Sequence, residues 1–141
     1  MKIVVPEKIS SELRKLEGIA EAQIESVFLG QSKSKNPKAT IKYVITDDMD
    51  GIPDGEPSTI GEPVLENYSL LPQSMWKIND TYKQVKGERI PQGDFTNEEF
   101  EEILVETLVG SNWTLVLELE IPDDGSSTEP RTVVTDKTYK G

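Results

Sequence analysis

The stretch AQIESVFLGQSKSKNPKATIKYVIT, residues 22–46, decides the fold of this chain. Two runs within it, 22–30 and 39–46, mix apolar and polar residues in the alternating way that is typical of β-strands. Between them lies a lysine-rich turn with Asn36 and Pro37, two residues that favour chain reversal. The stretch therefore predicts a β-hairpin with a basic tip.

The alternation also assigns the side chains of this hairpin to two faces. In the first strand we expect Ile24 and Phe28 to share one face, with Val27 and Leu29 on the other. In the second strand Lys42 is expected on the polar face. The apolar face of that strand is predicted to consist of Ile41, Tyr43 and Ile45.

Outward from the hairpin, the sequence predicts three helices and three more strands. Caps and apolar spacing indicate helices over 9–17, 72–86 and 97–109, and alternation indicates strands over 63–70, 113–121 and 131–136. Residues 47–62, with three Gly and two Pro, predict a long acidic loop. Strands at both ends with helices between them favour a single domain over 1–141. Its expected class is α+β, mostly β, built as a small antiparallel barrel or sandwich.

Composition excludes several classes of function. The 141 residues include 26 acidic and 15 basic side chains, a net charge of −11, and neither Cys nor His. Disulfides, Cys or His metal sites, a thiol nucleophile and a Ser-His-Asp triad are therefore excluded. With no Gly-rich phosphate loop, we expect no catalytic residue, no enzyme activity and no cofactor. No apolar run approaches the roughly 18 residues of a membrane span, so a cytoplasmic protein without a membrane partner is expected.

The acidic run DDMDGIPDGE, residues 47–56, invites comparison with a calcium-binding loop. At EF-hand spacing, however, Thr46 stands where the first Asp is needed and Pro57 where the final Glu is needed. We therefore expect a solvated acidic loop and no metal site.

Charge is segregated along the chain. Residues 31–46 contain no acid, and their basic side chains are Lys33, Lys35, Lys38 and Lys42. Residues 47–66 hold seven acids and 94–106 hold six, and neither stretch has a base. A hairpin of this kind can contact nucleic-acid phosphates, and Lys77 in the predicted helix 72–86 can join it. The alternative is that lysines in the turn only keep the hairpin soluble.

Three aromatic side chains are candidates for stacking on bases: Tyr43, Tyr68 and Trp76. The alternative for Tyr43 is a place in the core, because it is in register with Ile41 and Ile45. Spacing alone does not distinguish the three.

The chain resembles a family of small bacteriophage replication-module proteins. The resemblance covers about residues 20–136 and rests on the turn KSKNP (33–37), the strand end ITD (45–47), and the segments ENYSL (66–70), PQSMWKINDTYKQVKG (72–87) and WTLVLELE (113–120). It implies an OB-like barrel, that is, an oligonucleotide/oligosaccharide-binding barrel, with a role in binding single-stranded DNA. Lys35 stands where the family often has Gly.

Two hypotheses follow. The first is a non-catalytic single-stranded DNA-binding protein of phage DNA replication or recombination, whose acidic surfaces could recruit replication or recombination proteins. The alternative is a phage structural or protein-interaction module that uses those acidic faces, with self-association into a homo-oligomer left open. A weaker third idea is an acidic mimic of DNA.

Overall fold

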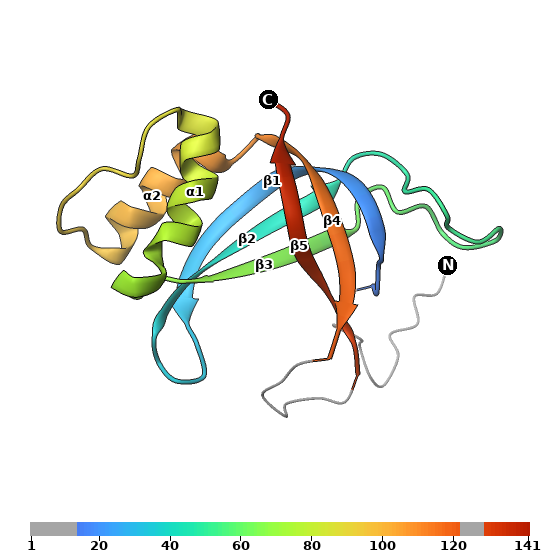
Figure 1. Ribbon diagram of the computed structural model, residues 1–141, viewed down its shortest axis with the longest axis horizontal. Coiled ribbons are helices and arrows are strands. Elements are labelled where there is room, and N and C mark those ends of the chain that lie inside the picture. Colours follow the sequence, from blue (N-terminus) through green and yellow to red (C-terminus); the bar gives the residue numbers. More distant parts are fainter. Residues whose placement is uncertain (1–13, 122–128) are drawn as a thin grey trace, which may run out of the picture.

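The computed structural model describes residues 14–121 and 129–141, which form a five-stranded antiparallel sheet and two α-helices (Figure 1). The elements are β1 (Gly18–Gln31), β2 (Pro37–Ile45), β3 (Pro63–Ser69), the short 3₁₀ helix η1 (Pro72–Ser74), α1 (Met75–Lys86), α2 (Asn97–Leu108), β4 (Asn112–Glu120) and β5 (Arg131–Tyr139). The predicted mostly-β α+β class is confirmed, as are the hairpin and the two inserted helices. β1 starts four residues earlier than predicted, and β5 runs three residues further.

The short N-terminal helix predicted over 9–17 is wrong where it can be checked. Residues 9–13 lie outside the described residues, and 14–17 are not helical. The reason is that the backbone N–H and carbonyl of Leu16 form hydrogen bonds with Thr132 on β5. Its N–H donates to Thr132 Oγ1 at 2.7 Å, and its carbonyl accepts from the same hydroxyl at 3.1 Å.

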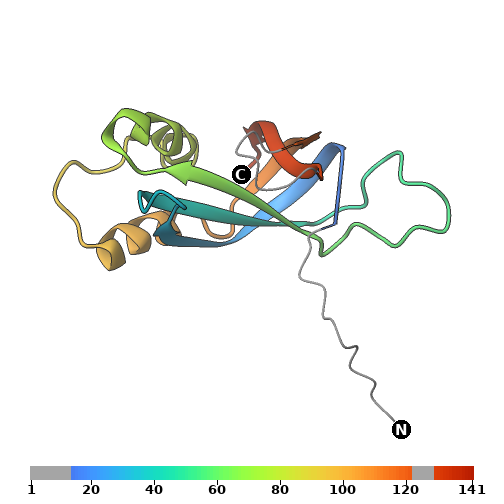
Figure 2. The same ribbon diagram turned by 90° about the horizontal axis from the view of Figure 1, so that it is seen from below.

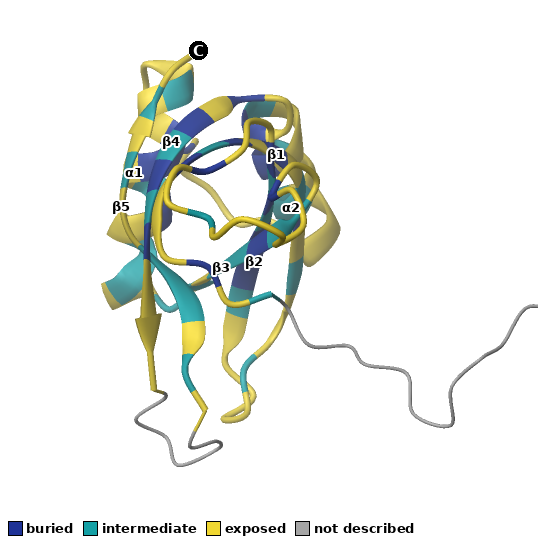
Figure 3. Cartoon of the chain, turned by 90° about the vertical axis from the view of Figure 1, so that its right-hand side faces the viewer, coloured by how far each residue is buried: buried dark blue, intermediate teal, exposed yellow. Residues whose placement is uncertain are grey.

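The strand order is β3-β2-β1-β4-β5, and every neighbouring pair is antiparallel. β1 is 14 residues long, so it can pair with β4 along 18–23 and with β2 along 22–31. The sheet curves around a common interior (Figure 3). Its two edge strands approach each other, because Lys137 Nζ on β5 lies 2.7 Å from Glu66 Oε1 on β3.

A β-bulge in β1 overturns the predicted faces of the first strand. The pairing register with β2 shifts between Ile24 and Ser26, so one extra residue interrupts the alternation. Ile24 and Val27 consequently both point into the core, and Phe28 is 45% exposed. The second strand follows its predicted pattern, with Ile41, Tyr43 and Ile45 buried.

The two helices lie at one end of the sheet, and the loop 46–62 lies at the other (Figure 2). α1 buries Ile78 and Tyr82 and ends at Gly87, which adopts the left-handed conformation (φ 84°) that glycine tolerates best. α2 begins with the predicted capping box of Thr96 and Glu99.

Every strand but β5, and both helices, contribute to one buried apolar core. Its largest fully buried apolar side chains are Trp113, Tyr43, Ile24, Ile41, Ile45, Ile78, Leu104, Leu108, Leu115 and Leu117. Each such side chain contributes roughly 1.5–3 kcal/mol when it leaves water. The indole N–H of Trp113 donates to Ser111 Oγ at 2.8 Å, so its burial leaves no polar atom unpaired.

The loop 47–62 contains neither helix nor strand, as predicted, but it is tied down from within. The carboxylate of Asp48 accepts hydrogen bonds from the Ser58 hydroxyl and the Thr59 N–H, and Thr59 is fully buried. These bonds lower the pKa of Asp48, the Ser58 hydroxyl being the largest cause. Hydrogen bonds within the loop therefore hold residues 48 and 58–59 together.

Candidate nucleic-acid interface

Three strands present one continuous polar and aromatic surface, which we call the outer face. Paired residues of antiparallel strands project to the same side of a sheet. The pairings Phe28–Thr40 and Thr40–Asn67 therefore put these three side chains in one row. The neighbouring rows add the following residues: Lys38 with Ser69, and Ser26 with Lys42 and Leu65.

Phe28 lies at the β1 end of the row with Thr40 and Asn67, and it is 45% exposed. Beside it, the Thr40 hydroxyl donates to Asn67 Oδ1 at 2.7 Å, and Thr40 is only 4% exposed. The hydrogen bond between Thr40 and Asn67 fixes the two side chains that follow the exposed ring of Phe28 in this row. Such a ring can stack on a flat partner such as a nucleobase.

Two lysines flank Phe28 on β2. Lys38 is half-buried two residues before Thr40, and Lys42 lies two residues after it. Lys42 Nζ is 3.0 Å from Glu25 Oε1, so Lys42 already forms an ion pair with a carboxylate. Of these two lysines, only Lys42 takes part in an ion pair among the described residues.

Lys33 and Lys35 lie exposed in the β1–β2 turn that adjoins this face. The turn is closed by Lys35 N–H to Ser32 O at 2.8 Å and Ser32 N–H to Asn36 O at 2.8 Å. Lys35 has φ 63°, the one positive φ of a non-glycine residue among the described residues. A left-handed residue here explains why glycine suits this position.

Tyr43 and Tyr68 do not belong to this surface. Tyr43 is 0% exposed, so its ring has no face on which a base could stack. It is therefore no longer a candidate for base stacking. Tyr68 is half-buried, and its hydroxyl lies 3.1 Å from Thr81 Oγ1 beneath α1. Burial raises the pKa of both hydroxyls.

Both tyrosines instead join what we call the interior cluster: Tyr43, Glu66, Tyr68, Thr81 and Lys137. The ammonium of Lys137 donates to Glu66 at 2.7 Å, to Tyr43 Oη at 3.3 Å and to Tyr68 Oη. It also lies 5.4 Å from the centre of the Trp113 ring. Burial lowers the pKa of Lys137, and Glu66 opposes that shift. The cluster links β3 to β5, and its polar groups form hydrogen bonds with one another.

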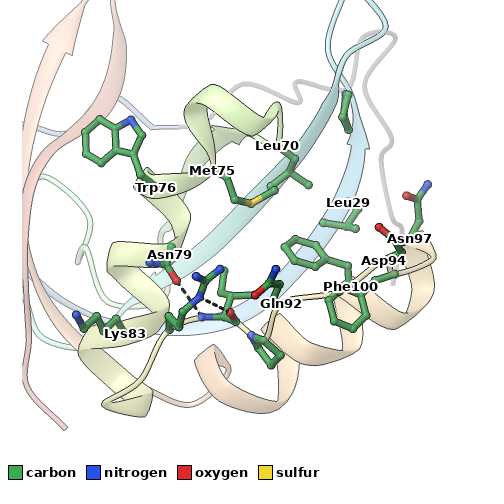
Figure 4. A pocket seen from close by; sticks show the side chains of 16 residues that line it. Leu29, Leu70, Met75, Trp76, Asn79, Lys83, Gln92, Asp94, Asn97 and Phe100 are labelled. Atoms are coloured by element: carbon green, nitrogen blue, oxygen red, sulfur yellow. Dashed lines mark hydrogen bonds between the residues drawn. The ribbon is translucent and has the colours of Figure 1, made fainter.

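Trp76 and Lys77, predicted from helix spacing, lie on α1 and not on the outer face. Trp76 is 65% exposed, and Lys77 Nζ is 5.6 Å from its ring centre. Trp76 lines a separate groove beside α1, shown in Figure 4. The predicted residues are thus divided among the outer face, the interior cluster and this groove.

Sequence reasoning missed Phe28 as a site residue. Strict alternation groups Phe28 with the buried Ile24, and only the bulge separates them. No signal in the sequence marks that bulge. Once the register is known, the position of Phe28 opposite Thr40 and between two lysines marks it as a candidate for base stacking.

The outer face presents an exposed aromatic ring, hydrogen-bonding side chains and lysines. Within 14–121 and 129–141, no cluster of His, Cys, Asp or Glu side chains could hold a metal ion. In the same ranges no helix is long and apolar enough to cross a membrane. No model of a known protein family matches the chain, and no curated protein is similar to it.

Proposed function

We propose that this protein is a non-catalytic single-stranded DNA-binding protein whose DNA lies along the outer face. The observation that carries the proposal is the row of Phe28, Thr40 and Asn67, with Lys38 and Lys42 on either side. Aromatic rings that stack on bases, set among cations that meet phosphates, are the groups such proteins use. Lys33 and Lys35 extend the basic surface beyond the sheet.

The strand arrangement supports the same proposal. We propose that the sheet is an OB-like barrel, a five-stranded partly open barrel in which strands 2 and 3 and the loop between strands 1 and 2 bind oligonucleotides. In support, β1 pairs with both β2 and β4, the helices come between β3 and β4, and Lys137 bridges to Glu66 across the edges. The basic turn is the loop between strands 1 and 2.

The resemblance to phage replication-module proteins supports a role in phage DNA replication or recombination. The acidic side of α2, with Glu98, Glu102 and Glu106 exposed, then faces partner proteins and not DNA. A net charge of −11 is compatible with binding because the basic groups are gathered on one hairpin.

Fluorescence anisotropy of a labelled oligothymidylate of about 15 nucleotides, titrated at several salt concentrations, tests the proposal. If four lysines neutralise four phosphates, log K falls with log salt with a slope of about −3. Replacing Lys33, Lys35 and Lys38 with Ala reduces that slope and weakens binding.

The matched control replaces Lys15, Lys86 and Lys140 with Ala, which changes the net charge equally away from the outer face. Its affinity stays close to that of the native protein. Equal losses of affinity in the two triple variants would mean that binding depends only on the net charge of the protein. An absence of binding at low salt would contradict the proposed function.

A further inference from the structure

A groove of about 810 Å³ opens between α1, residues 87–96 and the start of α2. Leu29, Met75 and Phe100 converge in it, and Trp76 stands at the outer rim on α1, with its ring directed away from these three side chains (Figure 4). Its volume is within the range of pockets that bind small molecules, roughly 300–1,000 Å³. Fold stability does not account for Trp76 and Phe95, which remain 65% and 36% exposed.

The wall formed by residues 87–96 is held against α1. Asn79 Oδ1 accepts the Ile90 N–H at 2.9 Å, and the Arg89 Nε donates to the Ile90 carbonyl at 3.1 Å. Toward the end of this segment the ring centroid of Phe95 lies 6.3 Å from that of Phe100 on α2. The groove is therefore a formed structure with aromatic side chains on more than one side.

The lining combines three kinds of group. Besides aromatic rings it has the amides Asn79, Gln92 and Asn97, and the cations Lys83 and Arg89. Of the described residues that line the groove, Asp94 is the only acidic one. Rings stack on bases, amides can bond to base edges, and cations meet phosphates. This set fits a flat, anionic ligand better than a purely apolar one.

The groove begins where the outer face ends. Lys38 and Ser69 form the last pair of that face, and their chain neighbours Pro37 and Leu70, which belong to the opposite face of the sheet, line the groove. Those two are joined by Leu70 N–H to Pro37 O at 2.9 Å. A strand of DNA that passes Lys38 reaches the mouth of the groove by turning around this end of the sheet.

We propose that this groove is a second subsite of the DNA site and takes unstacked bases from the strand that lies on the outer face. The inference rests on the proposed function. It assigns base contacts to Trp76 and Phe95 and phosphate contacts to Lys83 and Arg89, whereas the outer face alone would require none of these four.

The test compares two labelled ligands of about 15 nucleotides, an oligothymidylate and an abasic strand with the same sugar-phosphate backbone. The native protein is expected to bind the thymidylate about 100-fold more tightly, because only that ligand offers bases to stack on Phe28 and in the groove. The variant Trp76→Ala/Phe95→Ala is expected to lose about 10-fold of this preference and to retain its affinity for the abasic strand. Ile19→Ala, which truncates an equally exposed apolar side chain on β1, keeps the preference.

Tryptophan emission gives a second readout. The chain has two tryptophans, and Trp113 is fully buried. Thymidylate is expected to quench the emission of Trp76, and the abasic strand is not. In Trp76→Phe, which keeps an aromatic ring, the quenching disappears while binding persists.

The outcomes separate the two proposals. If both ligands bind with equal affinity, or if the full preference survives in Trp76→Ala/Phe95→Ala and is lost in Phe28→Ala, the groove proposal is overturned and the proposed function stands. If the groove variants leave every DNA measurement unchanged, the groove serves another ligand such as a peptide, and the inference is likewise overturned. If neither ligand binds, both proposals fall.

Discussion

Lysines in two regions of this molecule have opposite surroundings. Lys137 is enclosed by Glu66, two tyrosine hydroxyls and the Trp113 ring, with only 11% of its side chain exposed. The hairpin lysines, represented by Lys35, project from an exposed turn. A buried charge must be paired to offset its lost hydration, whereas an exposed charge contributes little to folding. Lys137 thus serves the fold, whereas the hairpin lysines lie at the surface, where a ligand can reach them.

The largest expected effect comes from breaking the interior pair. Glu66→Ala removes the carboxylate that balances Lys137 and is expected to lower the free energy of unfolding by about 3–5 kcal/mol. Urea denaturation followed by circular dichroism measures the loss. The double variant Glu66→Leu/Lys137→Met, which leaves no unpaired charge, is expected to recover most of it. A single variant as stable as the native protein would contradict the structural role of the pair.

The tyrosines of the interior cluster provide a pH test of the same region. Burial raises the pKa of Tyr43 and Tyr68 above the usual 10.0, so the folded state holds both protons longer than the unfolded state does. Their contribution to stability is therefore complete below about pH 10 and is lost as pH rises further. In an ultraviolet titration, Tyr43→Phe/Tyr68→Phe should leave the transition near pH 10 unchanged and remove only ionisation that accompanies unfolding. Loss of amplitude at the ordinary transition would show that the two hydroxyls are accessible.

Charge reversal on the hairpin is the counterpart experiment. Lys33→Glu, Lys35→Glu and Lys38→Glu together are expected to weaken single-stranded DNA binding about 100-fold, equivalent to about 2.7 kcal/mol. The midpoint of urea denaturation should change little, because exposed charges rarely contribute more than about 1 kcal/mol. An unfolded triple variant would show that these lysines serve the fold after all.

The variant Phe28→Ala tests whether the exposed ring on the outer face stacks on a base. Loss of one stacked base is expected to reduce affinity for oligothymidylate about 10-fold in anisotropy titrations, with the salt dependence unchanged. Ile60→Ala, a truncation of another exposed apolar side chain, is the control and should bind normally. If Phe28→Ala altered the salt slope instead, the ring would act by positioning the lysines and not by stacking.

The smallest effect concerns Lys35 itself. Glycine at this left-handed position relieves backbone strain, partly offset by its greater freedom in the unfolded chain, so Lys35→Gly should stabilise the protein by about 0.5 kcal/mol. DNA binding should weaken a few-fold because one cation is lost. Ser34→Gly, at a neighbouring residue without a positive φ, should give no stabilisation in the same thermal melts.

Local signals in the sequence were sufficient for much of the fold. Alternation predicted β2, and the Thr96–Glu99 capping box and Gly87 predicted a start and an end of helices. These features depend on residues a few positions apart. The acidic loop was predicted for the same reason, from its Gly and Pro content.

Features that depend on distant pairing could not be predicted. The bulge after Ile24 is defined only by its register against β2, and it exposed Phe28 contrary to the alternation. Lys137 and Glu66 are 71 residues apart in the chain and meet only because the sheet curves. Tyr43, by contrast, is buried in register with Ile41 and Ile45, which is the alternative that the alternation offered for it. Tyr68 lies in the inner row through its pairing with Ala39, which the sequence did not show.

Chemical-shift mapping of the isotope-labelled protein with oligothymidylate tests the central claim most directly, because it locates the DNA without any substitution. If the DNA lies along the outer face, the largest amide shifts fall on Phe28, the 32–36 turn, Lys38 and Lys42, with none on the acidic side of α2. Shifts confined to α2 or to the loop 47–62, or no shifts at all, would contradict it.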